Sequence, residues 1–286
     1  MQLESDLFYF AMRVVRKFIF PKVPTHIQKY IPGLRANYGT RSGSGPVNLY
    51  NRHLNSVDPE WLSSKTILEI GIGATNGSCY EMAARGAEKC YAFEPFVPFV
   101  RSLDQPLLLH CSSEHDINID KLRERVFRLT STSDLAAQSI DVVVSNSVLE
   151  HVTDLDSLNA ELFRLLRPDG LMLHIVDYRD HFFRFPYHHL LWSRNVWHQF
   201  LDPGDLPRWR IGDHIQCFER HGFSCRILKA EPISDEFAKI QSRIHPEFNR
   251  CSEQDLQTAY GVLLIKGRTF KGVAEARHEP SDCTHG

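Results

Sequence analysis

Residues 67–77 read ILEIGIGATNG, a short apolar run that carries one acid, Glu69, and is followed by three glycines within seven positions. The apolar run has the length and composition of a buried strand. Gly71, Gly73 and Gly77 allow a tight turn after it, in which a ligand can approach the backbone closely. In a doubly wound sheet, ligands bind beyond the carboxyl ends of the strands, where this turn lies. The stretch therefore predicts a ligand site at the first strand-to-helix turn of an α/β domain.

The rest of the chain alternates between strand and helix patterns. We expect strands at residues 66–71, 89–95, 126–131, 139–147, 171–178, 223–231 and 258–267. Helical patterns lie among them at residues 77–87, 98–110 and 154–170. Such alternation indicates a parallel sheet with helices on both faces. The last two apolar runs have no full helix between them, so they predict an antiparallel pair at one edge. The expected fold class is α/β, with a doubly wound, mostly parallel seven-stranded sheet.

Composition divides the chain into three parts. We expect an N-terminal helix-and-loop extension at residues 1–60, a main domain at residues 61–268 and a polar, disordered tail at residues 269–286. Residues 179–215, after the fifth strand, are rich in aromatic, histidine and arginine side chains, and we interpret them as a substrate cap. Residues 38–48, YGTRSGSGPVN, have the composition of a loop, either a linker or a segment that folds over a bound ligand.

The N-terminal extension begins with an amphipathic pattern. Apolar residues recur at helical spacing, among them Leu7, Phe10, Ala11, Val14 and Phe18. Basic residues lie between them: Arg13, Arg16 and Lys17. The pattern predicts a helix that either docks on the main domain or lies on an anionic membrane through residues 1–20.

Charge and cysteine usage exclude several classes of protein. The formal net charge is −2, so we expect no nucleic-acid partner. The seven cysteines form no CxxC pair, and no HExxH or HxxxH motif is present, so we expect no metal site. No apolar run reaches the roughly 18 residues that a membrane span requires. Without a signal-peptide pattern, the scattered cysteines favour a reducing compartment, and we expect a cytoplasmic protein that is peripheral to a membrane if the N-terminal helix binds one.

The glycine turn distinguishes between two kinds of nucleotide ligand. Its third glycine falls one residue late for the G-x-G-x-x-G pattern of dinucleotide sites, and Glu69 would repel a pyrophosphate. Glu94 ends the second expected strand, where a carboxylate can accept hydrogen bonds from the hydroxyls of a ribose. A ligand with a ribose, a cationic portion and no pyrophosphate fits these features, as S-adenosylmethionine does.

At this point the sequence resembles the class I S-adenosylmethionine-dependent methyltransferases. The matching blocks are LEIGIGATNG, YAFEP, IDVVVSNSVLEHVTD and ELFRLLRPDGLMLHIVD, which occur in the order and spacing of that family over residues 67–177. The resemblance implies the Rossmann-like methyltransferase fold, S-adenosyl-L-methionine as cofactor and a small-molecule or glycan acceptor.

The resemblance also implies roles for individual residues. Gly71 and Gly73 would back the methionine part of the cofactor, with Gly77 completing the turn, and Glu69 would lie under its amino group. Glu94 would hold the ribose, and Ser145 and Asn146 would contact the cofactor near its sulfonium. The acid that often contacts adenine after the third strand is missing, and Ser131, Thr132 or Asp134 could take its place.

Transfer to a hydroxyl group requires a base near the methyl group. His181 and His151 follow the fifth and fourth expected strands, and Asp180 or Asp177 could orient a histidine there. We favour His181 as the base. In the expected cap, aromatic and arginine side chains can stack on and grip an acceptor, with Arg208, Trp209, Arg210 and His214 as further candidates.

The favoured function is S-adenosylmethionine-dependent O-methylation of a small molecule, glycan or lipid-linked acceptor. The alternative is a non-catalytic partner or regulatory protein that binds the same cofactor. A nicotinamide-dependent reductase is disfavoured by the glycine spacing and by Glu69.

Overall fold

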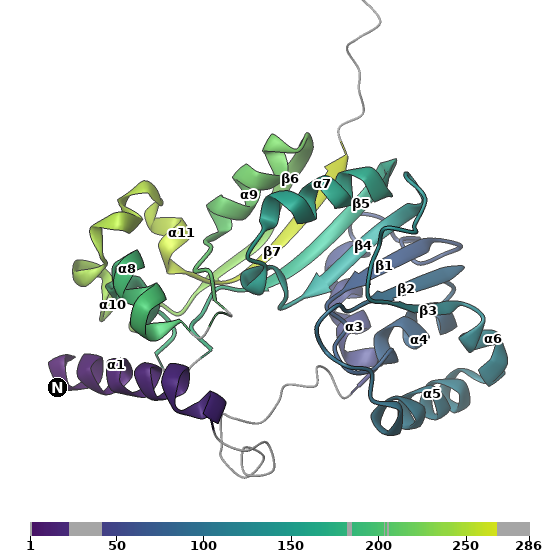
Figure 1. The fold of residues 1–286 in the computed structure, drawn as a ribbon. Helices are drawn as coiled ribbons and strands as arrows, with labels where there is room; N and C mark the ends of the chain where they lie inside the picture. The colour runs from purple at the N-terminus through teal and green to yellow at the C-terminus, as the bar shows by residue number, and fades with distance from the viewer. Residues whose placement is uncertain (1, 23–41, 182–184, 203, 205, 268–286) are drawn as a thin grey trace, which may run out of the picture.

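A computed structural model describes residues 2–22, 42–181, 185–202, 204 and 206–267 of the chain. Its seven strands form one sheet in the order β3-β2-β1-β4-β5-β7-β6 (Figure 1). They are β1 Thr66–Ile70, β2 Lys89–Phe93, β3 Val126–Leu129, β4 Ile140–Asn146, β5 Leu166–Asp177, β6 Phe223–Pro232 and β7 Thr258–Gly267. The first five strands pair in parallel, and β7 runs antiparallel to both β5 and β6. The predicted fold class is confirmed.

Helices cover both faces of the sheet because side chains along each strand point alternately to opposite sides. One face packs on α3 Ser44–Leu54, α4 Gly77–Ala84 and α5 Arg101–His115, and the other on α7 Leu155–Leu165 and α9 Ile211–Arg220 (Figure 1). On β1, Ile67 faces the first set and Leu68 the second. Two short elements complete this part, α6 Ile119–Arg123 and η2 Leu149–His151.

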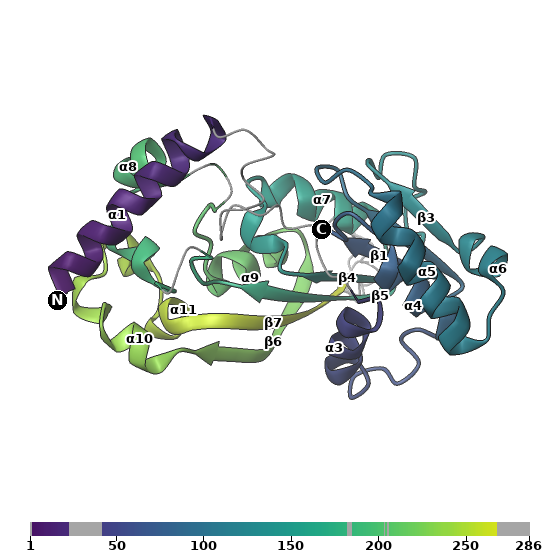
Figure 2. The same cartoon turned by 90° about the horizontal axis from the view of Figure 1, so that it is seen from below.

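A second group of elements forms a smaller unit, here called the side lobe. It consists of the N-terminal helix α1, residues 185–206 and the connection between β6 and β7. Its elements are α1 Gln2–Phe18, η1 Phe20–Lys22, η3 His188–Leu191, α8 Arg194–Val196, η4 Trp197–Leu201, α10 Ser234–Ala238, η5 Gln241–Arg243, η6 Pro246–Arg250 and α11 Glu253–Gln257. Figures 1 and 2 show α1 alongside α8, at the end of the molecule away from α4 and α5.

Two small apolar cores hold the side lobe together. One joins Tyr9 of α1 to Trp197, Leu201 and Leu206. The other joins Tyr187 and the η3 region to the segment between β6 and β7. The lobe is therefore built from three separate stretches of sequence, and the part between β6 and β7 was not anticipated from the sequence.

Helix α1 docks on the lobe through polar side chains as well. Arg13 is buried and forms an ion pair with Asp180, which also accepts a hydrogen bond from the hydroxyl of Tyr9. Asp6 receives a hydrogen bond from Arg243 and lies 3.3 Å from the His188 ring nitrogen. No helix in the described ranges is both long enough and apolar enough to cross a membrane.

The prediction of a loop at residues 38–48 is wrong in part. Helix α3 begins at Ser44, and residues 38–41 lie outside the described residues. Pro46 is compatible with this helix because the first turn has no intrahelical partners for its N–H groups. Val47, Tyr50 and Leu54 form a buried stripe at helical spacing. The tail expected at residues 269–286 also lies outside the described residues.

Candidate active site

The glycine turn follows β1 directly and adopts a conformation that requires glycine. Gly71 and Gly73 have positive φ angles of 71° and 78°. The N–H of Gly71 donates to the carbonyl of Phe93 over 2.9 Å, which ties the turn to the end of β2. A Cβ atom on Gly71 would lie 2.4 Å from Cγ2 of Val148, so the backbone packs where a side chain cannot fit. Gly77 is the first residue of α4.

Glu94 binds the glycine turn to the loop after β2. Its Oε2 accepts the N–H of Gly73 at 2.9 Å, and its Oε1 accepts the N–H groups of Phe96 and Val97 at 3.0 Å each. Its side chain is buried. A carboxylate offers about four acceptor sites, so this arrangement leaves acceptor capacity for a ligand hydroxyl.

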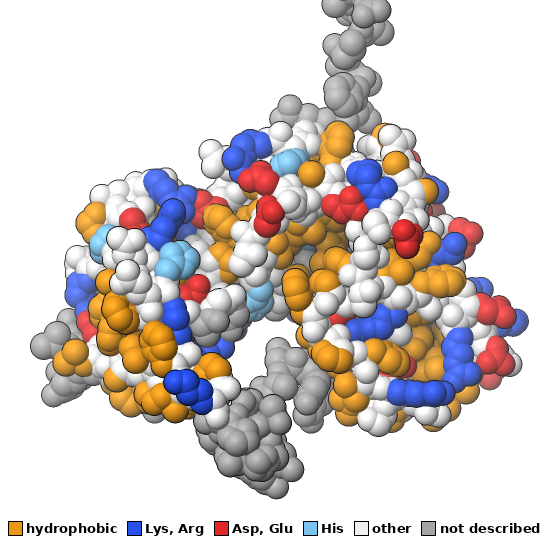
Figure 3. Space-filling model, viewed as in Figure 1, with side chains coloured by type: hydrophobic (Ala, Val, Ile, Leu, Met, Phe, Trp, Pro, Cys, Tyr) orange, Lys and Arg blue, Asp and Glu red, His pale blue; other side chains and the backbone are white. Residues whose placement is uncertain are grey.

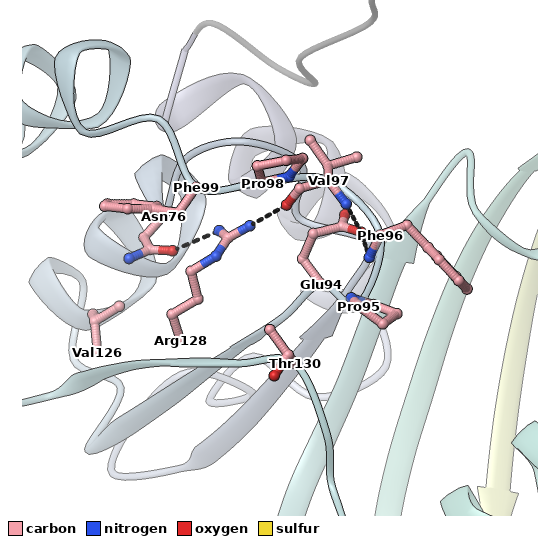
Figure 4. Close-up of a pocket in the computed structure, with 10 residues that line it drawn as sticks. All are labelled: Asn76, Glu94, Pro95, Phe96, Val97, Pro98, Phe99, Val126, Arg128 and Thr130. Atoms are coloured by element: carbon pink, nitrogen blue, oxygen red, sulfur yellow. Dashed lines mark hydrogen bonds between the residues drawn. The ribbon is translucent and has the colours of Figure 1, made fainter.

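A cavity of about 650 Å³ opens beside Glu94 (Figure 4). This volume is typical of a site for a small ligand. The lining residues come from the start of α4, the loop after β2, and β3: Asn76, Glu94, Pro95, Phe96, Val97, Pro98, Phe99, Val126, Arg128 and Thr130. Phe96 is 90% exposed, so an aromatic face is available at the rim. The cavity therefore combines a carboxylate with apolar surface, which suits a ribose and a base.

Arg128 of β3 lines this cavity but was not predicted as a site residue from the sequence. Its guanidinium donates to Oδ1 of Asn76 at 3.0 Å and to the carbonyl of Val97 at 3.2 Å (Figure 4). It also donates to the carbonyl of Gly73 at 2.6 Å. It thereby holds the glycine turn, the start of α4 and the loop after β2 in one arrangement. Burial lowers the pKa of Arg128. The only sequence signal was a charged residue within a short strand.

Glu69 lies buried beneath the turn and is satisfied within the protein. It accepts hydrogen bonds from the hydroxyls of Ser78 and, at 3.0 Å, Tyr50. Burial raises its pKa, and these hydrogen bonds oppose that effect. Tyr50 comes from α3, so the N-terminal extension contributes a residue to the support of the turn, which the sequence did not reveal.

The two residues expected at the end of β4 have different surroundings. Ser145 is fully buried, and its hydroxyl is 2.8 Å from Nδ1 of His174 on β5. The hydroxyl of Ser145 is thus engaged within the sheet, whereas Asn146 is partly exposed, and the contact of these two residues with the cofactor stays a prediction. Adjacent strand residues point to opposite faces, which explains the difference.

The three candidates for an adenine contact, Ser131, Thr132 and Asp134, are not among the residues that line the cavity beside Glu94. The hydroxyl of Thr132 donates to Glu161 of α7 at 2.7 Å, and the hydroxyl of Ser131 donates to Ser133 at 3.0 Å. The residue of this stretch that lines the cavity is Thr130. Asp134 is exposed and does not line it.

Glu150, His151 and His181 meet at the carboxyl ends of β4 and β5, and we call them the acceptor cluster. The rings of His151 and His181 are 5.1 Å apart between centroids. Nε2 of His181 lies 3.8 Å from Oε1 of Glu150, and its Nδ1 lies 3.6 Å from Oδ2 of Asp177. The molecular surface is hollowed between the side lobe and the main domain, on the side that these strand ends face (Figure 3).

Burial shifts the pKa values of two members of the acceptor cluster, His181 and Glu150. It lowers the pKa of His181, while the charge of Asp177 opposes this and that of His151 adds to it. Burial also raises the pKa of Glu150 to about 8; backbone amides of Glu150 and Asp177 oppose the rise, and the charge of Asp177 adds to it. At neutral pH both His181 and Glu150 are therefore favoured in their uncharged forms.

Asp180, one of the carboxylates expected to orient a histidine, is bound by the N-terminal helix. Its side chain has no exposed surface and pairs with Arg13 and Tyr9 of α1. Asp177 is the carboxylate that faces His181, and Arg179 holds it through two hydrogen bonds of 2.8 and 2.6 Å. The carboxylate of Asp180, which is adjacent to His181 in the sequence, is therefore bound by residues of the N-terminal helix.

The cap residues expected to grip an acceptor are instead structural. Arg210 is fully buried and donates to backbone carbonyls, including those of Tyr178 and Thr258. Arg208 binds two backbone carbonyls and Glu247. His214 lies between the hydroxyl of Tyr178 and the carbonyl of Leu149, and burial lowers its pKa to about 4.

Trp209 is engaged in the same way. Its indole N–H donates to the carbonyl of Val152 at 2.7 Å. Arg208 binds groups of the side lobe, Trp209 and His214 bind backbone carbonyls of the main domain, and Arg210 binds carbonyls of both parts.

Comparison with known proteins identifies the family of the chain. The profile of a family described as "Methyltransferase domain" matches residues 48–226, which is more than half of the chain. No curated protein matches the chain.

Solved structures with a similar fold include an S-adenosylmethionine dependent methyltransferase from Mesorhizobium loti, at 17% identity and a TM-score of 0.44, with 78% of this chain and 97% of that chain covered. Another is phosphoethanolamine N-methyltransferase 2 of Haemonchus contortus in complex with S-adenosyl-L-methionine, at 13% identity and a TM-score of 0.44, with 82% of this chain and 59% of that chain covered.

The crevice fits the cofactor of this family. The turn at Gly71 leaves no room for a Cβ atom, the carboxyl groups of Glu69 and Glu94 lie next to it, and a cavity lined by both polar and apolar residues opens beside Glu94. Such a site suits a ligand with an ammonium or sulfonium charge and a ribose. The chain belongs to the methyltransferase domain family and is an S-adenosylmethionine-dependent methyltransferase.

Proposed function

We propose that this methyltransferase acts on an oxygen atom of a small-molecule, glycan or lipid-linked acceptor, and that the acceptor cluster activates that oxygen. One observation carries the proposal. A histidine with a lowered pKa, His181, lies beside Glu150 and His151 at the same edge of the sheet as the glycine turn.

The cofactor supplies a methyl group that its sulfonium has already activated. An acceptor hydroxyl must lose its proton as its oxygen attacks, and a neutral imidazole can accept that proton. Asp177, placed 3.6 Å from Nδ1 of His181, favours a proton on that nitrogen and leaves Nε2 to face the acceptor. In the binding of the cofactor, we propose that Gly71, Gly73 and Gly77 form the backbone cradle, that Glu69 and Glu94 provide negative charge, and that Asn146 lies near the sulfonium.

The test is a screen for S-adenosylhomocysteine release across candidate phenols, glycans and lipid-linked hydroxyl compounds. With an active acceptor, His181→Ala should lower turnover by about 10²- to 10⁴-fold while its affinity for S-adenosylhomocysteine stays unchanged. His110→Ala, at an exposed position of α5, is the matched control. Unchanged turnover in His181→Ala would remove this histidine from the reaction. Cofactor binding without turnover of any acceptor would favour the non-catalytic alternative.

We also propose that α1 lies on an anionic membrane surface. The helix turns polar groups toward the side lobe: Lys17 donates to the carbonyl of His198, and Arg13 is buried. Its opposite side exposes apolar residues: Leu7 is 61% exposed, Phe8 51%, Phe18 44% and Ile19 53%. Leu7 and Phe8 are separated from Phe18 and Ile19 by about three helical turns, so the four side chains lie on one face of the helix.

An ordinary surface helix exposes mainly polar residues, whereas α1 exposes this apolar strip in addition to the apolar side chains that it packs on the side lobe, such as Tyr9. An exposed apolar helix face with basic residues near its C-terminal end is typical of helices that lie in a membrane interface. Basic residues at this end are Arg16, Lys17 and Lys22. Hydrophobic side chains are visible over α1 in Figure 3. A membrane-bound enzyme of this kind would meet a lipid-linked acceptor directly, and the buried thiols Cys79, Cys90, Cys111 and Cys217 suit the cytoplasmic, reducing side.

Cosedimentation with vesicles of phosphatidylglycerol and phosphatidylcholine tests the contact. The double variant Leu7→Gln, Phe18→Gln should bind at least about tenfold more weakly, because each side chain contributes about 1.5–3 kcal/mol when buried. The control is Leu109→Gln, Phe163→Gln, whose wild-type side chains are 48% and 45% exposed on other helices. Equal binding by wild type and the α1 variant, or no binding by wild type, would refute the membrane proposal.

A further inference from the structure

We propose that Glu150, His151 and His181 bind a divalent transition-metal ion. The binding itself does not depend on the proposed function, but its catalytic consequence rests on the transfer to oxygen proposed above. The ligand atoms of the three side chains all lie within 4.8 Å of one another. Side-chain torsions can close such a group around one ion, at metal–ligand distances near 2.0–2.2 Å.

Glu150 is the strongest indication of a missing cation. Its side chain is 1% exposed, and neither carboxylate oxygen has a hydrogen-bond partner among the described residues. Backbone amides approach it but do not reach hydrogen-bonding geometry. Burial of an unsatisfied carboxylate is costly, and buried charges in proteins are normally paired or coordinate a metal. Nε2 of His181, at 3.8 Å, is the nearest nitrogen of the cluster.

The surroundings of His181 have the form of an outer coordination shell. A metal-binding histidine usually donates its second ring N–H to a carboxylate, which fixes the orientation of the ring. Nδ1 of His181 faces Oδ2 of Asp177 at 3.6 Å while Nε2 points toward Glu150. Arg179 holds that carboxylate in place through two hydrogen bonds. The ring is thus positioned with one nitrogen supported and the other directed into the cluster.

Two other groups of potential metal ligands in the described part of the chain have comparable distances between their ligand atoms, but their acids differ from Glu150 in one respect. They are Glu81, Cys111 and His115, and Asp156, Cys217 and His221. The acid of each already has cationic partners: Arg85 and His115 contact Glu81, and His221 and Arg220 contact Asp156. Glu150 of the acceptor cluster differs because its ion-pair contact is with His181 at 3.8 Å, and among the described residues neither of its oxygens has a hydrogen bond or an arginine partner.

The donor set indicates the class of metal. Two imidazoles and one carboxylate favour Mn²⁺, Fe²⁺, Co²⁺ or Zn²⁺ over Mg²⁺ and Ca²⁺, and three ligands leave open positions. An acceptor hydroxyl bound there would lose its proton to water more readily. Its oxygen would form the bond to the methyl carbon as the carbon–sulfur bond breaks, with the electron pair remaining on sulfur. His181 would then serve as a ligand and not as a base.

The experiment titrates Mn²⁺ into metal-free full-length protein and follows the loss of the free-ion signal by electron paramagnetic resonance. Wild type should bind one equivalent. Glu150→Gln and His181→Ala should each weaken binding at least tenfold, and Asp177→Asn by about 10- to 100-fold through the orientation of His181. His221→Ala, from a group without an unsatisfied acid, should bind as wild type does.

S-adenosylhomocysteine titrations of the same variants establish that they are folded and separate the two proposals. Mn²⁺ binding that Glu150→Gln and His181→Ala abolish supports the metal site even if no acceptor is methylated, in which case the proposed function alone fails. An absence of saturable Mn²⁺ binding in wild type, or equal affinity in wild type and Glu150→Gln, overturns the metal site even if acceptors are methylated.

Discussion

Arg13 of α1 and Asp180, which are 167 residues apart in the chain, form a buried ion pair next to His181. The pair joins the proposed membrane-binding helix to the loop that carries a residue of the acceptor cluster. The position of α1 and the geometry of the acceptor side are therefore linked through Asp180, to which both Arg13 and Tyr9 of α1 bond.

Loss of Arg13 should destabilise the protein strongly. Arg13→Ala leaves the carboxylate of Asp180 buried without its cation, and breaking such a pair costs about 3–5 kcal/mol. The free energy of unfolding from urea denaturation measures this. Lys22→Ala, at an exposed position, should change it by less than about 0.5 kcal/mol. A loss below 1 kcal/mol in Arg13→Ala would show that the pair contributes little.

Gly71→Ala should impair both stability and cofactor binding. The new Cβ atom would lie 2.4 Å from Val148, and the φ angle of +71° costs a non-glycine residue about 1–2 kcal/mol. We expect at least a tenfold loss of affinity for S-adenosylhomocysteine by calorimetry, partly restored by adding Val148→Ala. Gly45→Ala, whose Cβ would meet only ordinary contacts at 3.6 Å, is the control. Wild-type affinity in Gly71→Ala would contradict the close packing of this turn.

The pH dependence of stability should report on Glu150 in metal-free protein. Its pKa is raised to about 8 from the ordinary value of 4.5, so the folded state favours the protonated form. The stability from this group is fully present below pH 4.5 and is lost as the pH rises toward 8. Relative to Glu150→Gln, wild type should lose about 1.4 kcal/mol per pH unit in this window.

Urea denaturation of both proteins at pH 6 and pH 8, with a chelator present, provides the measurement. A stability difference that stays constant between the two pH values would mean that Glu150 does not titrate in this range.

The sheet and the glycine turn were predictable because their signals are local. A strand followed by glycines at Gly71 and Gly73, with acids at Glu69 and Glu94, can be identified without knowledge of distant residues. The start of α3 was missed because Pro46 and its neighbours have loop composition, although Val47 and Tyr50 already show helical spacing.

The features of the site that sequence analysis did not predict depend on contacts between residues that are distant in the sequence. The partner of Asp180 comes from α1, so its proximity to His181 in the sequence was misleading. Arg208 and Arg210 looked available for an acceptor, but the backbone carbonyls that bind them belong to other segments. Arg128 gave no signal because its four partners converge only when the sheet forms. Such pairings follow from tertiary packing and not from periodicity.

The central claim is that the crevice formed by the glycine turn and Glu94 binds the adenosyl cofactor. Isothermal titration with S-adenosylhomocysteine tests it most directly, using wild type, Glu94→Ala and the exposed control Glu124→Ala. We predict one bound equivalent for wild type and the control, and affinity at least tenfold lower for Glu94→Ala because the hydrogen bonds to Gly73, Phe96 and Val97 are lost. No binding by wild type, or equal affinity in wild type and Glu94→Ala, would contradict it.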